Sequence, residues 1–138
     1  MSKLYKVGFT AGAFDLLHAG HIAMLEEAKS VCEHLIVGLQ EDPSLDRPEK
    51  NKPIQSLLER QIQLQAVRYV DRVIVYKTEA ELLTILKAMP IDVRIIGSDY
   101  LSKPFTGREL KIKLHYNRRD HDWSSSELRA RLAKSEKA

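Results

Sequence analysis

Short apolar runs alternate along this sequence with helix-like segments of ten or more residues, and this alternation limits the fold more than any other feature. Strands joined by helices of that length form right-handed crossovers and a parallel sheet. We therefore expect an α/β fold: a Rossmann-like, doubly wound, mostly parallel five-stranded sheet with helices on both faces. The apolar runs that predict its strands are residues 4–10, 35–39, 72–76, 93–97 and 111–116.

Helices are predicted between these runs by capping signals and by apolar spacing. A Ser or Thr followed three residues later by Glu is the sequence of a capping box, in which each side chain accepts a hydrogen bond from a free backbone N–H. One such pair, Ser56 and Glu59, opens a helix whose Leu58 and Ile62 fall on one face. Another helix is expected over residues 19–32, and a last one should turn Leu128 and Leu132 inward.

Length and composition limit the classes of function. The 138 residues suffice for one domain, residues 1–138, and no apolar run approaches the ~20 residues that span a bilayer. We expect a cytoplasmic protein with no membrane partner. The single cysteine, Cys32, excludes an intrachain disulfide and is expected to be buried in the helix over residues 19–32. A net charge of +3 without a basic, aromatic stripe favours small anionic ligands over nucleic acid.

Chemistry is expected beyond the carboxyl ends of the first and fourth strands, where open parallel sheets bind ligands. The first strand is followed by GAFDLLHAGH, residues 12–21. Its small residues let phosphates approach the backbone, and the helix that follows presents unpaired N–H groups and a partial positive charge. His18 and His21 stand at the start of that helix, where imidazoles can donate hydrogen bonds to phosphate oxygens.

This segment resembles the HxGH signature of the nucleotidylyltransferase superfamily. GAFDLLHAGH is similar to the form found in cytidylyltransferases, above all the glycerol-3-phosphate cytidylyltransferases, and the resemblance runs along nearly the whole chain. It implies one nucleotidylyltransferase domain over residues 1–138. The implied reaction transfers CMP from CTP to a phosphorylated small molecule similar to glycerol 3-phosphate and releases pyrophosphate. It also implies catalytic roles for His18 and His21, and nucleotide contacts for Gly12, Ala13, Phe14 and Gly20.

Other segments extend the resemblance and imply further roles. Arg119 would be catalytic, and the serines at the start of the last helix would bind the β- and γ-phosphates. Asp99, in a G-x-D segment after the fourth strand, would contact the nucleotide. The residues implied in acceptor or phosphate binding are two loop lysines and two arginines eight positions apart, and the three serines complete the set: Lys50, Lys52, Arg60, Arg68, Ser124, Ser125 and Ser126.

Residues 120–122 depart from the cytidylyltransferase pattern, and Ser124–Arg129 also resembles the I-S-S-T-x-x-R pattern of adenylyl-transferring relatives. An adenylyltransferase that uses ATP on a sugar phosphate or cofactor precursor is therefore the alternative, and a non-catalytic nucleotide-binding module is a more distant one. Mg²⁺ is the expected cofactor, bound mainly through phosphates and water. The region around Tyr69, Val70 and residues 73–76, which the family uses for pairing, predicts a homodimer.

Overall fold

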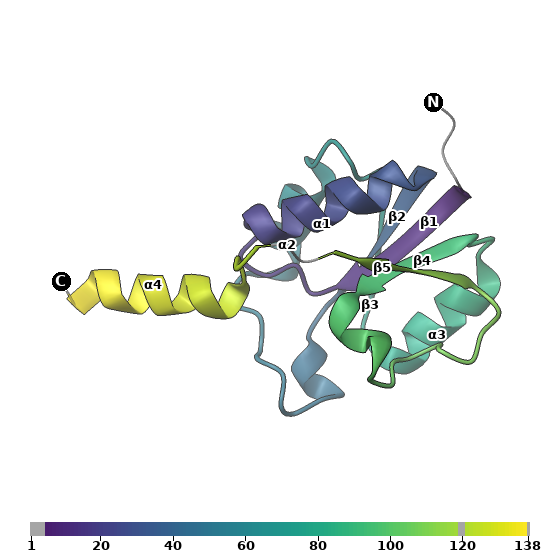
Figure 1. Ribbon diagram of the computed structural model, residues 1–138. Helices are drawn as coiled ribbons and strands as arrows, with labels where there is room; N and C mark the ends of the chain where they lie inside the picture. The colour runs from purple at the N-terminus through teal and green to yellow at the C-terminus, as the bar shows by residue number, and fades with distance from the viewer. Residues whose placement is uncertain (1–4, 119–120, 138) are drawn as a thin grey trace.

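Five parallel strands form one sheet, in the order β3-β2-β1-β4-β5, in the computed structural model of the chain, which describes residues 5–118 and 121–137 (Figure 1). This arrangement confirms the predicted Rossmann-like α/β fold. The third and fourth strands have the predicted bounds, and the first two extend beyond them. The bounds are Tyr5–Gly12 for β1, Cys32–Gln40 for β2, Arg72–Tyr76 for β3, Val93–Gly97 for β4 and Lys113–Asn117 for β5.

Helices cover both faces of the sheet, so its strands are apolar on both sides. Leu25 of α1 and Leu64 of α2 pack on one face, and Leu82 and Leu86 of α3 pack on the other. The bounds are Ala19–Ser30 for α1, Leu57–Gln65 for α2, Glu79–Ala88 for α3 and Ser125–Lys137 for α4, with short 3₁₀ helices η1 at Pro43–Leu45 and η2 at Ser98–Leu101. No helix among residues 5–118 and 121–137 is long and apolar enough to cross a membrane.

The helices differ from the prediction in three places. Helix α1 ends at Ser30, and Cys32 therefore begins β2, where its thiol is buried and donates to the carbonyl oxygen of Ala28. On α2, Leu58 and Ile62 face outward, 66% and 59% exposed, while Arg60 and Leu64 face the sheet. On α4, Leu132 is half exposed because this helix projects away from the sheet (Figure 1).

The central strand β1 separates from β4 halfway along its length. It pairs with β2 as far as Gly12, but with β4 only at Gly8 and Phe9. The backbone from Thr10 onward therefore diverges from the end of β4. This is the point where the strand order reverses, so a ligand site is expected in the space between the two strand ends.

Candidate functional site

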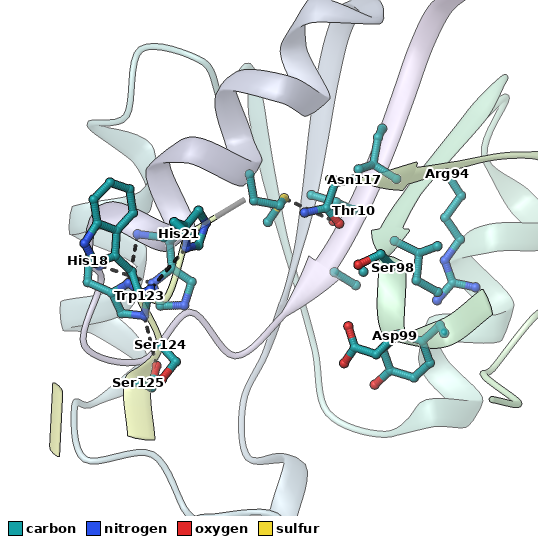
Figure 2. Close-up of a pocket in the computed structure, with 18 residues that line it drawn as sticks. Thr10, His18, His21, Arg94, Ser98, Asp99, Asn117, Trp123, Ser124 and Ser125 are labelled. Atoms are coloured by element: carbon teal, nitrogen blue, oxygen red, sulfur yellow. Dashed lines mark hydrogen bonds between the residues drawn. The ribbon is translucent and has the colours of Figure 1, made fainter. Parts of the chain in front are cut away.

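Two adjoining cavities lie where β1 and β4 diverge. The first, of about 320 Å³, is lined by the start of α1, the end of β4, η2 and residues 121 and 123–125 (Figure 2). The second, of about 630 Å³, extends from the same wall toward the loop after β2 and the start of α3. The wall common to both is formed by Ala11, Arg94, Ile96 and Tyr100.

Two histidines cap helix α1 reciprocally. His18 is the N-cap, with extended backbone, and its Nδ1 accepts a hydrogen bond of 3.0 Å from the N–H of Gly20. The N–H of His18 in turn donates to Nδ1 of His21, at 3.2 Å. This is the geometry of a capping box made with imidazoles in place of the usual hydroxyl and carboxylate.

The cap also determines where each imidazole carries its proton. A neutral ring has one donor and one acceptor nitrogen, and Nδ1 is the acceptor in both rings, so Nε2 carries the hydrogen. Nε2 of His18 lies 3.3 Å from Oγ of Ser125, and the two ring centroids are 4.0 Å apart. Both rings line the first cavity, so the pair supplies Nε2–H donors there.

His21 is neutral at physiological pH. Burial, assisted by the neighbouring His18, lowers the pKa of its imidazole to about 4, and the opposing effect of Asp15 is smaller. A neutral ring whose Nδ1 accepts a hydrogen bond is a donor at Nε2, and it takes up no second proton near pH 7.

Gly20 is required by the close packing at this cap. A Cβ at this position would lie 2.8 Å from Cε1 of His18 and 3.0 Å from the carbonyl oxygen of Trp123. Phe14, expected to contact the nucleotide, is instead buried in the core with its ring centroid 5.5 Å from that of His21. Its positive φ of 50° turns the chain between β1 and α1 and brings its ring against His21.

Asp15 connects the turn after β1 with residues 54–55 and with α4. Its carboxylate accepts hydrogen bonds from the backbone N–H groups of Ile54 and Gln55, at 2.8 and 2.9 Å, and pairs with Arg129 of α4 at 3.0 Å. Its side chain is 8% exposed. Sequence reasoning missed this residue, although a single carboxylate within the otherwise apolar Phe14–Leu17 turn was a usable signal.

Arg60 has a different place from the one expected of a phosphate ligand. It is buried, and its guanidinium donates to the backbone carbonyls of Gln55, Ala13, Gln40 and Glu41 at 2.6–3.2 Å. It lines neither of the two cavities, because its guanidinium is bound to these carbonyls. Arg60 therefore fastens the ends of β1 and β2 to α2.

Arg68 lies away from both cavities. Helix α2 ends at Gln65, so the helical spacing that would align Arg68 with Arg60 stops before it. Arg68 is exposed in the turn that precedes β3, at the amino ends of the strands, and donates to the hydroxyl of Tyr69. The expected role in acceptor binding does not agree with this position.

Most of the remaining predicted residues line one of the two cavities. Asp99, Ser124 and Ser125 line the first, as do the histidines and Gly20. Figure 2 shows the serines beside His18, with Arg94, Ser98 and Asp99 across the cavity. Gly12, Ala13 and Lys50 line the second cavity. Lys52 and Ser126 are exposed and line neither cavity, and Arg119 lies outside the described residues.

Sequence reasoning missed several residues of the second cavity, including Arg47, Tyr76, Glu79 and Arg94. The signal for Arg94 was present: it is a cation within the apolar run of β4 (VRIIG), and it is 6% exposed. A buried charge of this kind needs a partner, which in a binding site can be the ligand.

Metal-binding potential is limited in this site. Among residues 5–118 and 121–137 there is no group of three or more His, Cys, Asp or Glu side chains placed to hold a metal ion. Asp99 is the carboxylate that lines the first cavity. This arrangement suits Mg²⁺ that arrives with a nucleotide, because such an ion keeps most of its ligands on phosphate and water.

Comparison with known proteins adds sequence evidence to this geometry. The cytidylyltransferase-like family model matches residues 9–131. The bifunctional protein HldE of Helicobacter pylori (strain HPAG1) is 36% identical over 124 residues, which cover 89% of this chain and 27% of that protein. HldE of Paramagnetospirillum magneticum is 40% identical over 109 residues, 78% of this chain and 22% of that protein. The chain thus spans about a quarter of the length of these relatives.

One solved structure has a similar fold over nearly the whole chain. It is the lipopolysaccharide core biosynthesis protein from Thermoplasma volcanium, with a TM-score of 0.59 and 22% sequence identity. The match covers 94% of this chain and 88% of the other. At this identity the similarity establishes the fold.

The two arginines of the expected acceptor site should differ in their effect on stability. Arg60→Met removes a buried guanidinium from four carbonyls, and we expect the free energy of unfolding to fall by about 3 kcal/mol. Arg68→Met, in which the lost side chain is on the surface, should leave the urea midpoint almost unchanged. Equal, small effects of both substitutions would contradict the structural role of Arg60.

His21 should make stability depend on pH between its two pKa values. The unfolded ring binds a proton near pH 6.5 and the folded ring only near pH 4. The unfolded state therefore gains protons first, and the free energy of unfolding should decrease as pH falls from 6.5 to 4, by at most about 3 kcal/mol. Urea unfolding of His21→Asn should show a smaller decrease, whereas the exposed His34→Asn should behave as wild type. An identical pH dependence in all three proteins would refute this.

Proposed function

The chain belongs to the cytidylyltransferase-like family, and from this premise we propose that it transfers the AMP group of ATP to the phosphate of a sugar phosphate. That it is a nucleotidyltransferase follows from the family and its HldE relatives. The observation that carries the proposed chemistry is the reciprocal His18–His21 cap, which supplies Nε2–H donors to a cavity at the helix N-terminus.

The proposed reaction is an in-line displacement at the α-phosphorus. An oxygen of the acceptor phosphate forms a new P–O bond there, while the bond to the bridging oxygen of the β-phosphate breaks and pyrophosphate leaves with those electrons. The acceptor oxygen is already anionic, so no general base is needed. His18 and His21 donate from Nε2 to the α-phosphate oxygens as negative charge redistributes, and the backbone N–H groups of α1 assist them.

Mg²⁺ is the proposed cofactor. When bound, it neutralises charge on the triphosphate and on the leaving pyrophosphate. Asp99 is the residue of the first cavity that would hold it, together with phosphate oxygens and water. The serines at the start of α4 contribute in a different way. Ser124 caps this helix, because its hydroxyl accepts a hydrogen bond from the N–H of Glu127 at 3.0 Å. The other N–H groups in the first turn of α4 can bind phosphate.

Three observations support ATP and a sugar phosphate over CTP and a glycerol phosphate. The HldE proteins that resemble the chain favour the adenylyl alternative. Residues 120–122 lack the cytidylyltransferase pattern. The segment that is similar to adenylyl-transferring relatives lies against the site, because Ser125 contacts His18 and Arg129 pairs with Asp15. The second cavity, at about 630 Å³, has room for a larger acceptor. Because ATP is an intracellular metabolite, the proposed reaction belongs in the cytoplasm.

A homodimer is part of this proposal. Strand β3 is at the edge of the sheet, where its free side presents unpaired backbone groups, and Val75 on it is 37% exposed. The neighbouring α2 exposes Leu58 and Ile62, which are large apolar residues with no described neighbour covering them. A second copy of the chain on this side would cover both the strand edge and these side chains.

The proposed reaction is tested by pyrophosphate release with ATP or CTP and a panel of phosphorylated acceptors: hexose 1-phosphates, glycerol 3-phosphate and phosphopantetheine, each with Mg²⁺. We expect the highest kcat/KM with ATP and a hexose 1-phosphate. His18→Ala and His21→Ala should each lower kcat by at least about a hundredfold, the usual loss for a transition-state donor.

Two outcomes would contradict these expectations. A preference for CTP with glycerol 3-phosphate would return the assignment to the cytidylyltransferases. Near-normal turnover in either histidine variant, with the melting temperature unchanged, would remove the proposed mechanism. The exposed His34→Ala is the matched control and should retain full activity.

The dimer is tested by light scattering at micromolar concentration. The wild-type chain should have twice the monomer mass of 15.8 kDa. Ile62→Asp, which places a charge in the proposed interface, should yield monomers. Leu132→Asp changes a leucine on α4 of similar exposure, 51% against 59% for Ile62, and should leave the dimer intact. A monomeric wild-type chain would refute the dimer without affecting the catalytic proposal.

A further inference from the structure

The second cavity is lined by charged side chains that the displacement at the α-phosphorus does not itself require. We infer that it binds the phosphate of a polyhydroxylated acceptor between Arg94 and Arg47, and binds the acceptor's hydroxyl groups through Glu79 and its partners. This inference rests on the proposed function for the acceptor's role in catalysis. The binding itself rests only on the cavity.

Arg94 is held with its guanidinium at the wall between the two cavities. One of its Nη1–H groups donates to the carbonyl oxygen of Thr106, and its Cζ lies 5.2 Å above the ring centroid of Phe105. These contacts orient the planar group but use few of its five N–H donors. Arg94 lines both cavities (Figure 2), and Thr106 is the one acceptor of its guanidinium among the described residues. An oriented guanidinium is well suited to bind two phosphate oxygens at once.

Arg47 approaches the same cavity from the loop after β2. Its Nε is buried and has no hydrogen-bond partner among the described residues. A buried N–H without an acceptor is unfavourable, and a phosphate oxygen would satisfy it. Lys50, from the same loop, lines the cavity as well. The cavity therefore has cations from two separate elements, β4 and the loop.

Glu79, the first residue of α3, supplies the opposite charge. Its carboxylate accepts from Nε2 of Gln40 at 3.1 Å and from the hydroxyl of Thr106 at 3.0 Å. Both partners are neutral groups that also have acceptor atoms. A carboxylate with an amide and a hydroxyl beside it can accept hydrogen bonds from the vicinal hydroxyls of a sugar and donate to them in return.

The charge and volume of the cavity agree with a phosphorylated polyol. Three cations, Arg47, Lys50 and Arg94, and one carboxylate, Glu79, line it, so the net charge of these residues is +2. This matches a phosphate monoester, which carries nearly two negative charges at pH 7. A volume of about 630 Å³ leaves space for a sugar ring beyond the phosphate. Because Arg94 lies on the wall common to both cavities, a phosphate bound to it would lie next to the first cavity, which His18 and His21 line.

The inference is tested by calorimetric titration of the wild-type chain with glucose, mannose and galactose 1-phosphate and with inorganic phosphate, in the absence of nucleotide. Arg94→Lys and Arg47→Met should each weaken binding of the tightest hexose 1-phosphate and of inorganic phosphate by at least about tenfold, whereas the dissociation constant for ATP should change less than about threefold. Arg108→Met is the matched control, because Arg108 contacts the same Phe105 ring, at 5.6 Å, and lines neither cavity.

Glu79→Gln separates the hydroxyl contacts from the phosphate contacts. It should weaken binding of the hexose 1-phosphate at least fivefold while inorganic phosphate binds as tightly as before or more tightly. Melting temperatures identify variants that fail to fold, and Arg47→Met is the informative variant in that case because Arg47 lies on a loop.

Two results would overturn the inference: no binding of any hexose 1-phosphate or of phosphate to the wild-type chain, or unchanged affinities in folded Arg94→Lys and Arg47→Met. Because these titrations need no turnover, arginine-dependent binding without pyrophosphate release would refute the proposed function and leave this site established. Release of pyrophosphate, with unchanged affinities of the arginine variants, would support the proposed function and refute the inferred site.

Discussion

The reciprocal hydrogen bonds between His18 and His21 are the interaction on which the rest of the site depends. They begin helix α1, and they also assign both imidazole protons to Nε2. Gly20 lacks a side chain because a Cβ would displace the His18 ring. Ser125, from the far end of the sequence, reaches the same ring. Helix capping and the proposed donation to a phosphate thus depend on one arrangement, and a change that disturbs either would disturb both.

Arginine has two distinct uses in this fold, and the partners of each guanidinium separate them. Arg60 donates to four backbone carbonyls, which saturate it and leave it a structural element under the loop. Arg94 has one described acceptor and lies on the wall of two cavities. Both are buried and neither has a carboxylate within salt-bridge distance among the described residues. Of the two, Arg94 is therefore the one that can offer further N–H donors to a ligand.

The sequence predicted the sheet and the location of the site because parallel strands buried on both faces form continuous apolar runs. The bounds of β3 and β4 agree with the prediction to the residue, and the cavity that His18 and Asp99 line is beyond the carboxyl ends of β1 and β4, where chemistry was expected. Roles that depend on tertiary contacts were not predictable in this way. Arg60 and Arg68 appear equivalent at helical spacing, but the helix ends between them and backbone carbonyls capture the first.

The shared wall of the two cavities, formed by residues of β1, β4 and η2, has a consequence for inhibitor design. Three of its four residues, Ala11, Arg94 and Ile96, belong to strands, so the two cavities lie side by side at the same edge of the sheet. Under the proposed function, a single molecule that joins a nucleotide to a sugar through a non-transferable linker would occupy both cavities at once. Its second half would bind at the high effective concentration that a short tether creates, without a second loss of translational freedom. Bisubstrate compounds of this type should therefore bind more tightly than either half alone.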